Sequence, residues 1–411
     1  MNGRTVIELF KAWVLQLVAA WDRFWFTPRY PHVLGILRIV TGGMLFYSHL
    51  VLATQLGDFL GDHAWINNAT AVQLHDGAFG VSDMGRSYLW HLSNPLLLWL
   101  HHGATLLITA AFAIGFMTRV TAPAAWFLQL MYIHRLTGTL FGLDQIVTYM
   151  AMYLMLTPSG SCFSVDAWLR ERFSERRKSS RKLAWLLPEN RASIATNVGT
   201  RLLQLHLCVI YLFGGLAKAR GELWWDGTAV WFAVANYEYQ SMNMIWIGNY
   251  PRIFSALTHL TLFWEVFYCA LVWPRITRPI VIAIAVLVHG GIAVSLGMVT
   301  FGFMMIVANC IFIEPKWLLW RSASDLSDVS PVPIRDELTG KDVVREESAV
   351  DDSDLRQREE KLAEDKEKLK QRVETLKKRE RKVRRAAKKL RDRGAGDHDD
   401  LSELDEPLEL D

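Results

Sequence analysis

The chain has 411 residues, of which 51% are hydrophobic and 21% are charged, and its formal net charge is +3. The charges are unevenly placed, because residues 321–411 carry 22 Lys/Arg and 26 Asp/Glu, which leaves 23 basic and 16 acidic residues among the first 320. This asymmetry excludes one uniform globular domain, and the apolar first part excludes a wholly disordered chain. Four cysteines in this length are too few for a disulfide framework.

Residues 1–30 predict an amphipathic helix that lies in the membrane interface. Apolar side chains recur at helical spacing between residues 5 and 26, and charged or amide side chains fall between them. The pattern lacks the features of a cleavable signal peptide. A helix that packs on the rest of the molecule is the alternative.

Residues 31–320 predict a transmembrane domain. A helix that crosses a bilayer needs about 20 mostly apolar residues, and fewer when it is packed inside a bundle. Eight segments fit, of which the third, fourth and eighth are short: residues 32–55, 95–116, 120–134, 142–157, 198–218, 254–273, 279–295 and 298–313. They lack the polar stripe of a soluble surface helix. The fold class expected is therefore all-α, a polytopic bundle of about eight spans.

The positions of lysine and arginine predict the orientation of this bundle. Basic residues concentrate before the first span, in the loop at residues 170–191, and in two short turns at Arg119 and at Arg275 and Arg278. Acidic residues predominate in the first loop and in the loop after the fifth span. Because short cytoplasmic loops are enriched in basic residues, we expect a multi-pass protein of the cell membrane (plasma or inner), with both termini in the cytoplasm.

The last ninety residues form a separate module. Residues 321–350 read as a flexible linker, and residues 394–411 as an acidic disordered tail. Between them, residues 351–393 predict a charged helix in which Leu or Val recurs every seventh residue from Leu355 to Leu390. The companion seam position is mostly polar, so a solvated helix or a weak coiled coil is expected. Self-association or a cytoplasmic protein partner would use residues 355–390, whereas nucleic acid is not favoured.

Ionisable residues inside the predicted spans mark candidate sites, because they are costly to bury in a bilayer. They are Arg38, His49, His101, His102, Asp144, His206, Lys218, His259, Glu265 and His289. No pair has the spacing that puts two ligands on one helix face, so no metal site is predicted. A structural salt bridge of Arg38 with Asp144 or Glu265 remains an alternative to a functional role.

Lys218 is the most distinctive of these residues. It lies at the outer end of the fifth predicted span, after the adjacent glycines Gly214 and Gly215, which allow close helix packing. A lysine held away from water can act as a catalytic base. The alternative is a lysine that extends to the interface while its stem stays in the apolar region.

Three segments resemble the HTTM domain, the membrane region shared with vitamin K-dependent gamma-carboxylase. The first is Gly214-Gly-Leu-Ala-Lys-Ala-Arg-Gly-Glu-Leu-Trp224-Trp-Asp-Gly227. The second is Thr139-Leu-Phe-Gly-Leu-Asp144 with the segments at 156–160 and 164–166, and the third runs from His289 to Met298 and on to residue 315. The resemblance covers roughly residues 25–320.

This resemblance implies that Lys218 is the base that deprotonates a reduced quinone of the vitamin K type, at the outer membrane face. In the carboxylase, oxygenation of that hydroquinone drives the carboxylation of glutamate. The implied catalytic residues are Lys218, His289 and His134, with His134 three residues from the matching position. The substrate-pocket candidates are Arg38, Asp144, Trp224, Asp226 and Glu265.

The carboxylase carries a large lumenal domain after its spans, where this chain has a charged helix. Glutamyl carboxylation itself is therefore not favoured. The alternative class is a non-enzymatic membrane scaffold, or a protein that binds lipid or a small ligand and recruits cytoplasmic partners through its C-terminal helix.

Overall fold

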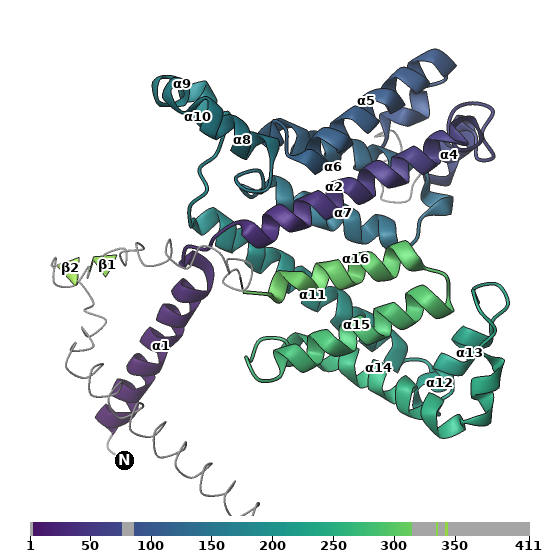
Figure 1. Ribbon diagram of the computed structural model, residues 1–411. Helices are drawn as coiled ribbons and strands as arrows, with labels where there is room; N and C mark the ends of the chain where they lie inside the picture. The colour runs from purple at the N-terminus through teal and green to yellow at the C-terminus, as the bar shows by residue number, and fades with distance from the viewer. Residues whose placement is uncertain (1–2, 76–85, 315–333, 336–341, 344–411) are drawn as a thin grey trace, which may run out of the picture. The chain divides into compact units, whose positions relative to one another are not determined.

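The computed structural model describes residues 3–75, 86–314, 334–335 and 342–343 (Figure 1). The chain divides into two units, Met1–Arg321 and Ser322–Asp411. The described residues of the second unit are two short strands, β1 (Ile334–Arg335) and β2 (Asp342–Val343), which pair antiparallel. The predicted charged helix at 351–393, its seam at 355–390 and the acidic tail at 394–411 lie outside the described residues.

The described part of the first unit is built from helices, which confirms the all-α class for this unit (Figure 1). The α-helices are α1 (Gly3–Phe26), α2 (His32–Ala53), α3 (Leu56–Phe59), α4 (Asn68–His75), α5 (Pro95–Ile114), α6 (Thr118–Arg135), α7 (Gly142–Met155), α8 (Val165–Arg172), α9 (Ser174–Ser179), α10 (Arg181–Leu186), α11 (Ile194–Ala219), α12 (Glu222–Trp225), α13 (Ala229–Ala235), α14 (Pro251–Leu271), α15 (Arg278–Ser295) and α16 (Val299–Asn309). Short 3₁₀ turns are η1 (Tyr88–His91), η2 (Thr137–Thr139), η3 (Ile245–Asn249) and η4 (Cys310–Phe312).

Each of the eight predicted spans coincides with a helix, and five of these helices are long and apolar enough to cross a membrane: α2, α5, α11, α14 and α15. The chain is therefore a membrane protein. The other three are the spans that were short in the sequence. Helix α16 has 11 residues, and at 1.5 Å per residue it covers only about half of a 30 Å hydrocarbon core. Helix α6 contains Pro123 and carries arginines at both ends.

The turn between α5 and α6 shows how the sequence ends one helix and begins the next. Helix α5 ends at Gly115, whose φ of 73° suits glycine, and a Cβ there would lie on the guanidinium of Arg38. The carboxylate of Asp166 then accepts hydrogen bonds from the backbone N–H groups of Met117 (2.7 Å) and Thr118 (2.8 Å) at the start of α6. Asp166 thus satisfies donors that a helix N-terminus leaves open.

The helices pack in pairs around a main apolar core, and a smaller apolar cluster lies around Leu56, Leu89 and Tyr132. Helix α2 lies against α5, α11 against α14, and α15 against α16, while α7 contacts α2, α6, α11 and α16. The core includes Leu37, Phe112, Met150 and Tyr268, which are fully buried. Lipid is as apolar as these side chains, so moving them from lipid to a helix interface gains no hydrophobic free energy. The close van der Waals packing of the helices stabilises the bundle instead.

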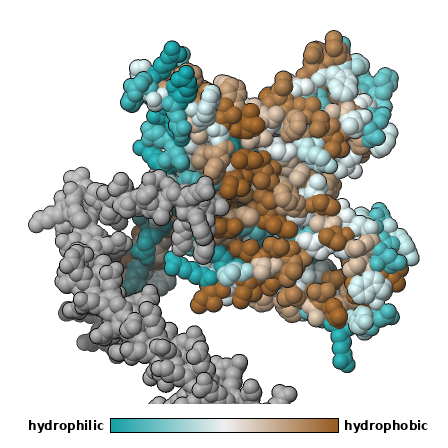
Figure 2. Space-filling model, in the orientation of Figure 1, coloured by the Kyte–Doolittle hydropathy of each residue, from teal (hydrophilic) through white to brown (hydrophobic). Residues whose placement is uncertain are grey.

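The outer faces of the helices are apolar, as expected of a surface in contact with lipid. Large apolar side chains stay exposed in the middle of the spans; Leu107 is 74% exposed and Leu287 is 71% exposed. Figure 2 shows hydrophobic residues over the middle of the visible face of the bundle, with hydrophilic residues gathered around α8–α10 and near α4. A soluble monomer rarely exposes so continuous an apolar surface.

Helix α1 contacts the bundle through its C-terminal end. The side-chain amide of Asn197 on α11 donates hydrogen bonds to the backbone carbonyls of Phe24 and Trp25, each at 2.8 Å. Closer to the N-terminus of α1, Trp13 and Trp21 are exposed. Figure 1 shows α1 extending away from the other helices, so the middle of α1 leaves these aromatic side chains without cover from the bundle.

The contact between α2 and α5 can be tested with two adjacent glycines. A Cβ at Gly42 would lie 2.6 Å from the Cα of Ala113, whereas a Cβ at Gly43 would meet no atom within 4 Å. Gly42→Ala should lower the free energy of unfolding by about 1–3 kcal/mol, because two backbones must move apart. Gly43→Ala should leave it unchanged or raise it by up to about 1 kcal/mol, through helix propensity.

The measurement is the midpoint of thermal unfolding of both purified variants in detergent. Equal midpoints for the two variants would contradict the close backbone contact at Gly42.

Candidate functional site

An ion pair joins the C-terminal end of helix α11 to the C-terminal half of helix α14. Nζ of Lys218 donates to Oε2 of Glu265 over 2.7 Å, and the two side chains are 30% and 9% exposed. Gly215 makes the pairing possible, because a Cβ there would lie 2.8 Å from the backbone nitrogen of Val266. The absence of a side chain lets α11 and α14 approach closely, one turn before Lys218.

An aromatic ring lies beside the Lys218 ammonium. The ring centroid of Trp224 is 5.5 Å from Nζ, within the range of a cation–π contact. A short turn places this ring: the backbone N–H of Gly221 donates to the carbonyl of Lys218 over 2.9 Å, and α12 begins at the next residue. Lys218 is thus held by Glu265 on one side and by an indole on another.

A second layer of polar groups lies deeper between α11, α14, α15 and α16. Tyr268 donates its hydroxyl to Oδ1 of Asn309 (2.7 Å), and Nδ2 of Asn309 donates to the hydroxyl oxygen of Tyr211 (2.8 Å). The hydroxyl of Tyr211 lies 2.7 Å from Nε2 of His289. All four side chains are buried.

The order of donors in this layer assigns the tautomer of His289. Since the Tyr211 oxygen already accepts from Asn309, its own proton is free for Nε2 of His289, which then acts as acceptor. A neutral imidazole with an acceptor at Nε2 carries its proton on Nδ1. Nδ1 of His289 is buried and has no hydrogen-bond partner among the described residues. Such a group is a natural contact for a polar atom of a ligand.

The structure brings together four residues that the sequence analysis selected: Lys218, Glu265, Trp224 and His289. His289 is linked to the others through Tyr211, which lies two turns before Lys218 on α11 and 2.7 Å from Nε2 of His289. The ring of Trp264 packs within the deeper layer, with its centroid 4.9 Å from that of Tyr211 and 6.2 Å from that of His289.

Arg38 lies elsewhere and makes a structural contact. Its Nη2 donates to the backbone carbonyl of Phe163 over 2.5 Å, and its guanidinium covers Gly115 at the end of α5. Two ion pairs were possible for Arg38, one with Asp144 and one with Glu265, and neither occurs among the described residues. Glu265 pairs with Lys218 instead.

The remaining candidates have local roles in the structure. Asp144 accepts from the backbone N–H of Phe141 over 3.1 Å and caps the start of α7. Asp226 accepts from the backbone N–H of Thr228 over 2.9 Å, just before α13. Nδ1 of His134 donates to a backbone carbonyl over 3.2 Å. None of these contacts is with Lys218, Glu265, Trp224 or His289.

Tyr211, Tyr268 and Asn309 were not among the candidates predicted from the sequence. Two of them carried a signal in their spacing. Tyr211 precedes Lys218 by seven residues, about two helical turns, and so shares its face of α11, and Tyr268 follows Glu265 by three residues on α14. Asn309 sits near the end of an apolar helix and had no such relation to a residue already selected.

A separate chain of hydrogen bonds links α2, α5, α6 and η1. His102 contacts the backbone carbonyl of His49 through Nε2 (2.9 Å), so its Nδ1 accepts from the hydroxyl of Tyr132 (2.8 Å). The Tyr132 oxygen in turn accepts from Nδ1 of His101 (3.2 Å), and Nε2 of His101 accepts from the hydroxyl of Tyr88 (2.6 Å). The partners satisfy each imidazole in its neutral form, which suits a buried histidine.

No group of three or more His, Cys, Asp or Glu side chains that could hold a metal ion occurs in the part of the chain that the structure describes. A cavity of about 10 Å³ between α7 and α11, lined in part by Tyr153 and His206, has room for about one water molecule. A larger one, of about 290 Å³, lies among arginines at the opposite end of the bundle from Lys218.

Comparison of the chain with protein-family models, with curated proteins and with solved structures finds no match. The resemblance to the HTTM domain therefore remains a prediction from the three motif segments. The chemistry of the candidate site has to be argued from its own side chains.

The Lys218–Glu265 pair predicts a characteristic pattern of stabilities. Lys218→Met leaves a buried carboxylate without its partner and should cost about 1–3 kcal/mol, less than for a fully buried pair, because the lysine is partly exposed. The double variant Lys218→Met/Glu265→Leu should recover most of this loss, since no charge is then left unpaired.

The unfolding midpoints of wild type, both single variants and the double variant together form a double-mutant cycle, which measures the coupling between the two residues. Arg220→Ala, which removes an exposed charge two residues from Lys218, is the matched control and should have little effect. Simple additivity of the two single variants would contradict the pairing.

Proposed function

We propose that this chain is a polytopic membrane protein of the HTTM type, whose Lys218–Glu265 pair is an acid–base centre for a reduced quinone or a similar aromatic hydroxyl compound. The observation that supports this most is the ion pair itself, at 2.7 Å, with a carboxylate that is only 9% exposed. Charged side chains in a bilayer are costly, and where they occur they commonly serve a substrate or proton pathway.

The surroundings of the pair suit a flat aromatic molecule. A Cβ at Gly214 would lie 3.5 Å from Oε2 of Glu265 and 3.9 Å from Nζ of Lys218, so glycine leaves bare backbone next to both charged groups. The indole of Trp224 offers a ring surface on the same ammonium. Nδ1 of His289 supplies a buried donor without a partner among the described residues.

Proton transfer at this centre would involve both members of the pair. A lysine can act as a base only as a neutral amine, and Oε2 of Glu265, 2.7 Å away, is the group that can take its proton. In a low-dielectric setting the charged and neutral forms of such a pair lie closer in free energy than in water. After transfer, the Lys218 ammonium can stabilise an oxyanion. When bound, a reduced quinone would be the compound that molecular oxygen oxidises.

We also propose that all eight helices lie within the membrane and that the end of the bundle carrying Arg119, Arg278 and the segment 170–191 faces the cytoplasm. The basic residues at this end support the orientation. Helices α6, α7 and α16 are too short or too polar to cross alone, but packing within a bundle reduces the apolar length that a span requires. In this orientation Lys218 lies on the outer side.

This orientation predicts which introduced cysteines a membrane-impermeant maleimide reaches in intact cells. Glu238→Cys lies in the loop after α13 and should be labelled. Ser179→Cys lies at the end of α9 and should be labelled only after the membrane is permeabilised. Wild type measures the background from the native cysteines. Labelling of Ser179→Cys in intact cells would show that the proposed orientation is wrong.

Activity is tested with protein purified into nanodiscs and supplied with reduced vitamin K and oxygen. Wild type should retain quinone and form the epoxide. Lys218→Ala should lower the rate by about 100-fold or more, because a positioned base commonly contributes a factor of 10²–10⁴. Arg220→Ala should stay within about twofold of wild type, since a nearby surface charge does not take part in proton transfer.

The double variant Lys218→Met/Glu265→Leu is the control for misfolding, because it removes the acid–base centre without leaving an unpaired buried charge. If wild type neither binds quinone nor forms epoxide, while all variants fold, the catalytic proposal is wrong. The non-enzymatic alternative, a scaffold or ligand-binding protein, would then account for the chain better.

A further inference from the structure

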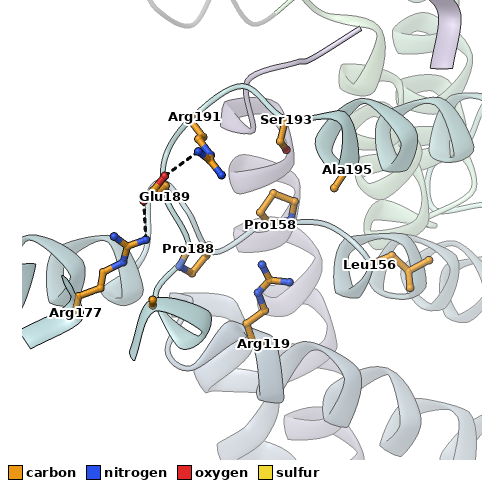
Figure 3. A pocket seen from close by; sticks show the side chains of 10 residues that line it. Arg119, Leu156, Pro158, Arg177, Pro188, Glu189, Arg191, Ser193 and Ala195 are labelled. Carbon is orange, nitrogen blue, oxygen red and sulfur yellow. Dashed lines mark hydrogen bonds and ion pairs between the residues drawn. The ribbon is translucent and has the colours of Figure 1, made fainter. Parts of the chain in front are cut away.

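A cavity of about 290 Å³ opens at the end of the bundle away from Lys218 (Figure 3). Its wall comes from the start of α6, the turn after α7, helices α9 and α10, and the segment that leads into α11. Three of its lining residues are arginines, Arg119, Arg177 and Arg191, and one is the acidic residue Glu189. Such a volume is at the small end of the range for ligand sites, of the order of 300 Å³, and suits a headgroup-sized ligand.

The arginines are not neutralised within the cavity. Glu189 pairs through Oε1 with Nη2 of Arg177 (3.0 Å) and through Oε2 with Nη1 of Arg191 (3.3 Å). The hydrogen bond from Arg177 lowers the pKa of Glu189, so the carboxylate is ionised at neutral pH. One negative charge therefore faces three positive charges.

Arg119 is the arginine left for a ligand. It has no ion pair or hydrogen bond to another side chain in the described ranges, and Figure 3 shows its guanidinium directed toward Pro158 and Pro188 on the cavity wall. Its position on the backbone is fixed, because Asp166 binds the N–H groups of the two preceding residues.

Other hydrogen bonds keep the wall in place. Nη1 of Arg170 donates to the carbonyls of Ser161 (2.7 Å) and Pro188 (2.9 Å), and so ties the turn after α7 to the segment before α11. Ser193, also on the wall, caps α11 by accepting from the N–H of Thr196 over 3.2 Å. The site is thus organised before any ligand binds, which lowers the entropic cost of binding.

The cavity lies where a membrane surface would meet the bundle. It is formed at the ends of α7 and α11, and α11 is one of the five helices able to cross a membrane. Leu156 on its wall and Ile194 beside it are exposed apolar residues. A ligand held by the arginines could therefore extend an apolar part along the lipid-facing surface.

We propose that this arginine-lined cavity binds the phosphate of an anionic phospholipid, with Arg119 as its principal ligand. Guanidinium groups bind phosphate oxygens with paired, charge-assisted hydrogen bonds, and the excess positive charge favours an anionic over a zwitterionic headgroup. The exposed apolar residues at its edge favour a phosphate that carries acyl chains over a free one. This binding is independent of any chemistry at Lys218.

The test uses full-length protein in detergent, titrated with phosphatidylglycerol or phosphatidylcholine, with bound lipid counted by native mass spectrometry. Wild type should bind phosphatidylglycerol in preference to phosphatidylcholine. Arg119→Gln should weaken phosphatidylglycerol binding by about fivefold or more, as expected for one basic contact to an anionic lipid. Ala184→Leu fills the cavity without changing its charge and should also reduce binding.

Arg172→Ala is the matched control, because it removes an exposed arginine from the same basic segment but outside the cavity. It should change binding by less than twofold. An equal loss in Arg172→Ala and Arg119→Gln would mean general surface attraction and would overturn the site. Displacement of the lipid by an equal concentration of glycerol 3-phosphate would overturn the lipid as the source of the phosphate. Unfolding midpoints without lipid verify that each variant is folded.

Discussion

The close crossing of α11 and α14 at Gly215 is the constraint on which the rest of the candidate site depends. With no side chain at this position, the backbone of α11 reaches that of α14 at Val266, and Lys218 comes within 2.7 Å of Glu265. A larger residue would separate the helices and leave a carboxylate buried without its partner, which is among the more costly defects a membrane helix can carry. The same crossing brings the ring centroids of Tyr211 and Tyr268 to 4.2 Å, so the deeper polar layer depends on it too.

The two ends of the bundle use polar side chains in different ways. Toward the Lys218 end, titratable groups face one another across helices, as in the Lys218–Glu265 pair and the chain from Tyr88 to His102. At the other end, Asp166 and Arg38 bind backbone groups, since Asp166 caps α6 and Arg38 donates to the carbonyl of Phe163, while Arg177 and Arg191 pair with Glu189. Side chains that satisfy backbone groups fix the ends of helices, whereas side chains that face each other can exchange protons or bind a ligand. The two ends thus differ in burial: the carboxylate of Glu265 is 9% exposed, whereas that of Glu189 at the other end is 45% exposed.

Periodicity and hydropathy were enough to place all eight helices, because each depends on local composition. They were also enough to select Lys218, Glu265 and His289, because a buried ionisable residue is conspicuous in an apolar segment. They could not pair them. The sequence left Glu265 as a partner for Arg38, and only the crossing at Gly215 decides that Lys218 reaches it first. Asn309 could not be selected at all, since one amide near the end of an apolar helix acquires its role from Tyr211 and Tyr268 on other helices.

The basic residues that predict the orientation also acquire a second use once the chain is folded. Counting lysines and arginines treats Arg119, Arg177 and Arg191 alike, since each adds one positive charge to the same end of the bundle. Folding makes them different. Arg177 and Arg191 both pair with Glu189. Arg119 lies at the start of α6 beside the cavity, and no acidic side chain among the described residues pairs with it. A charge that only set the orientation could sit anywhere in the loop. A charge held by Asp166 and surrounded by fixed walls is placed as a ligand-binding group would be, and this placement separates lipid recognition from the general attraction of a basic surface for a membrane.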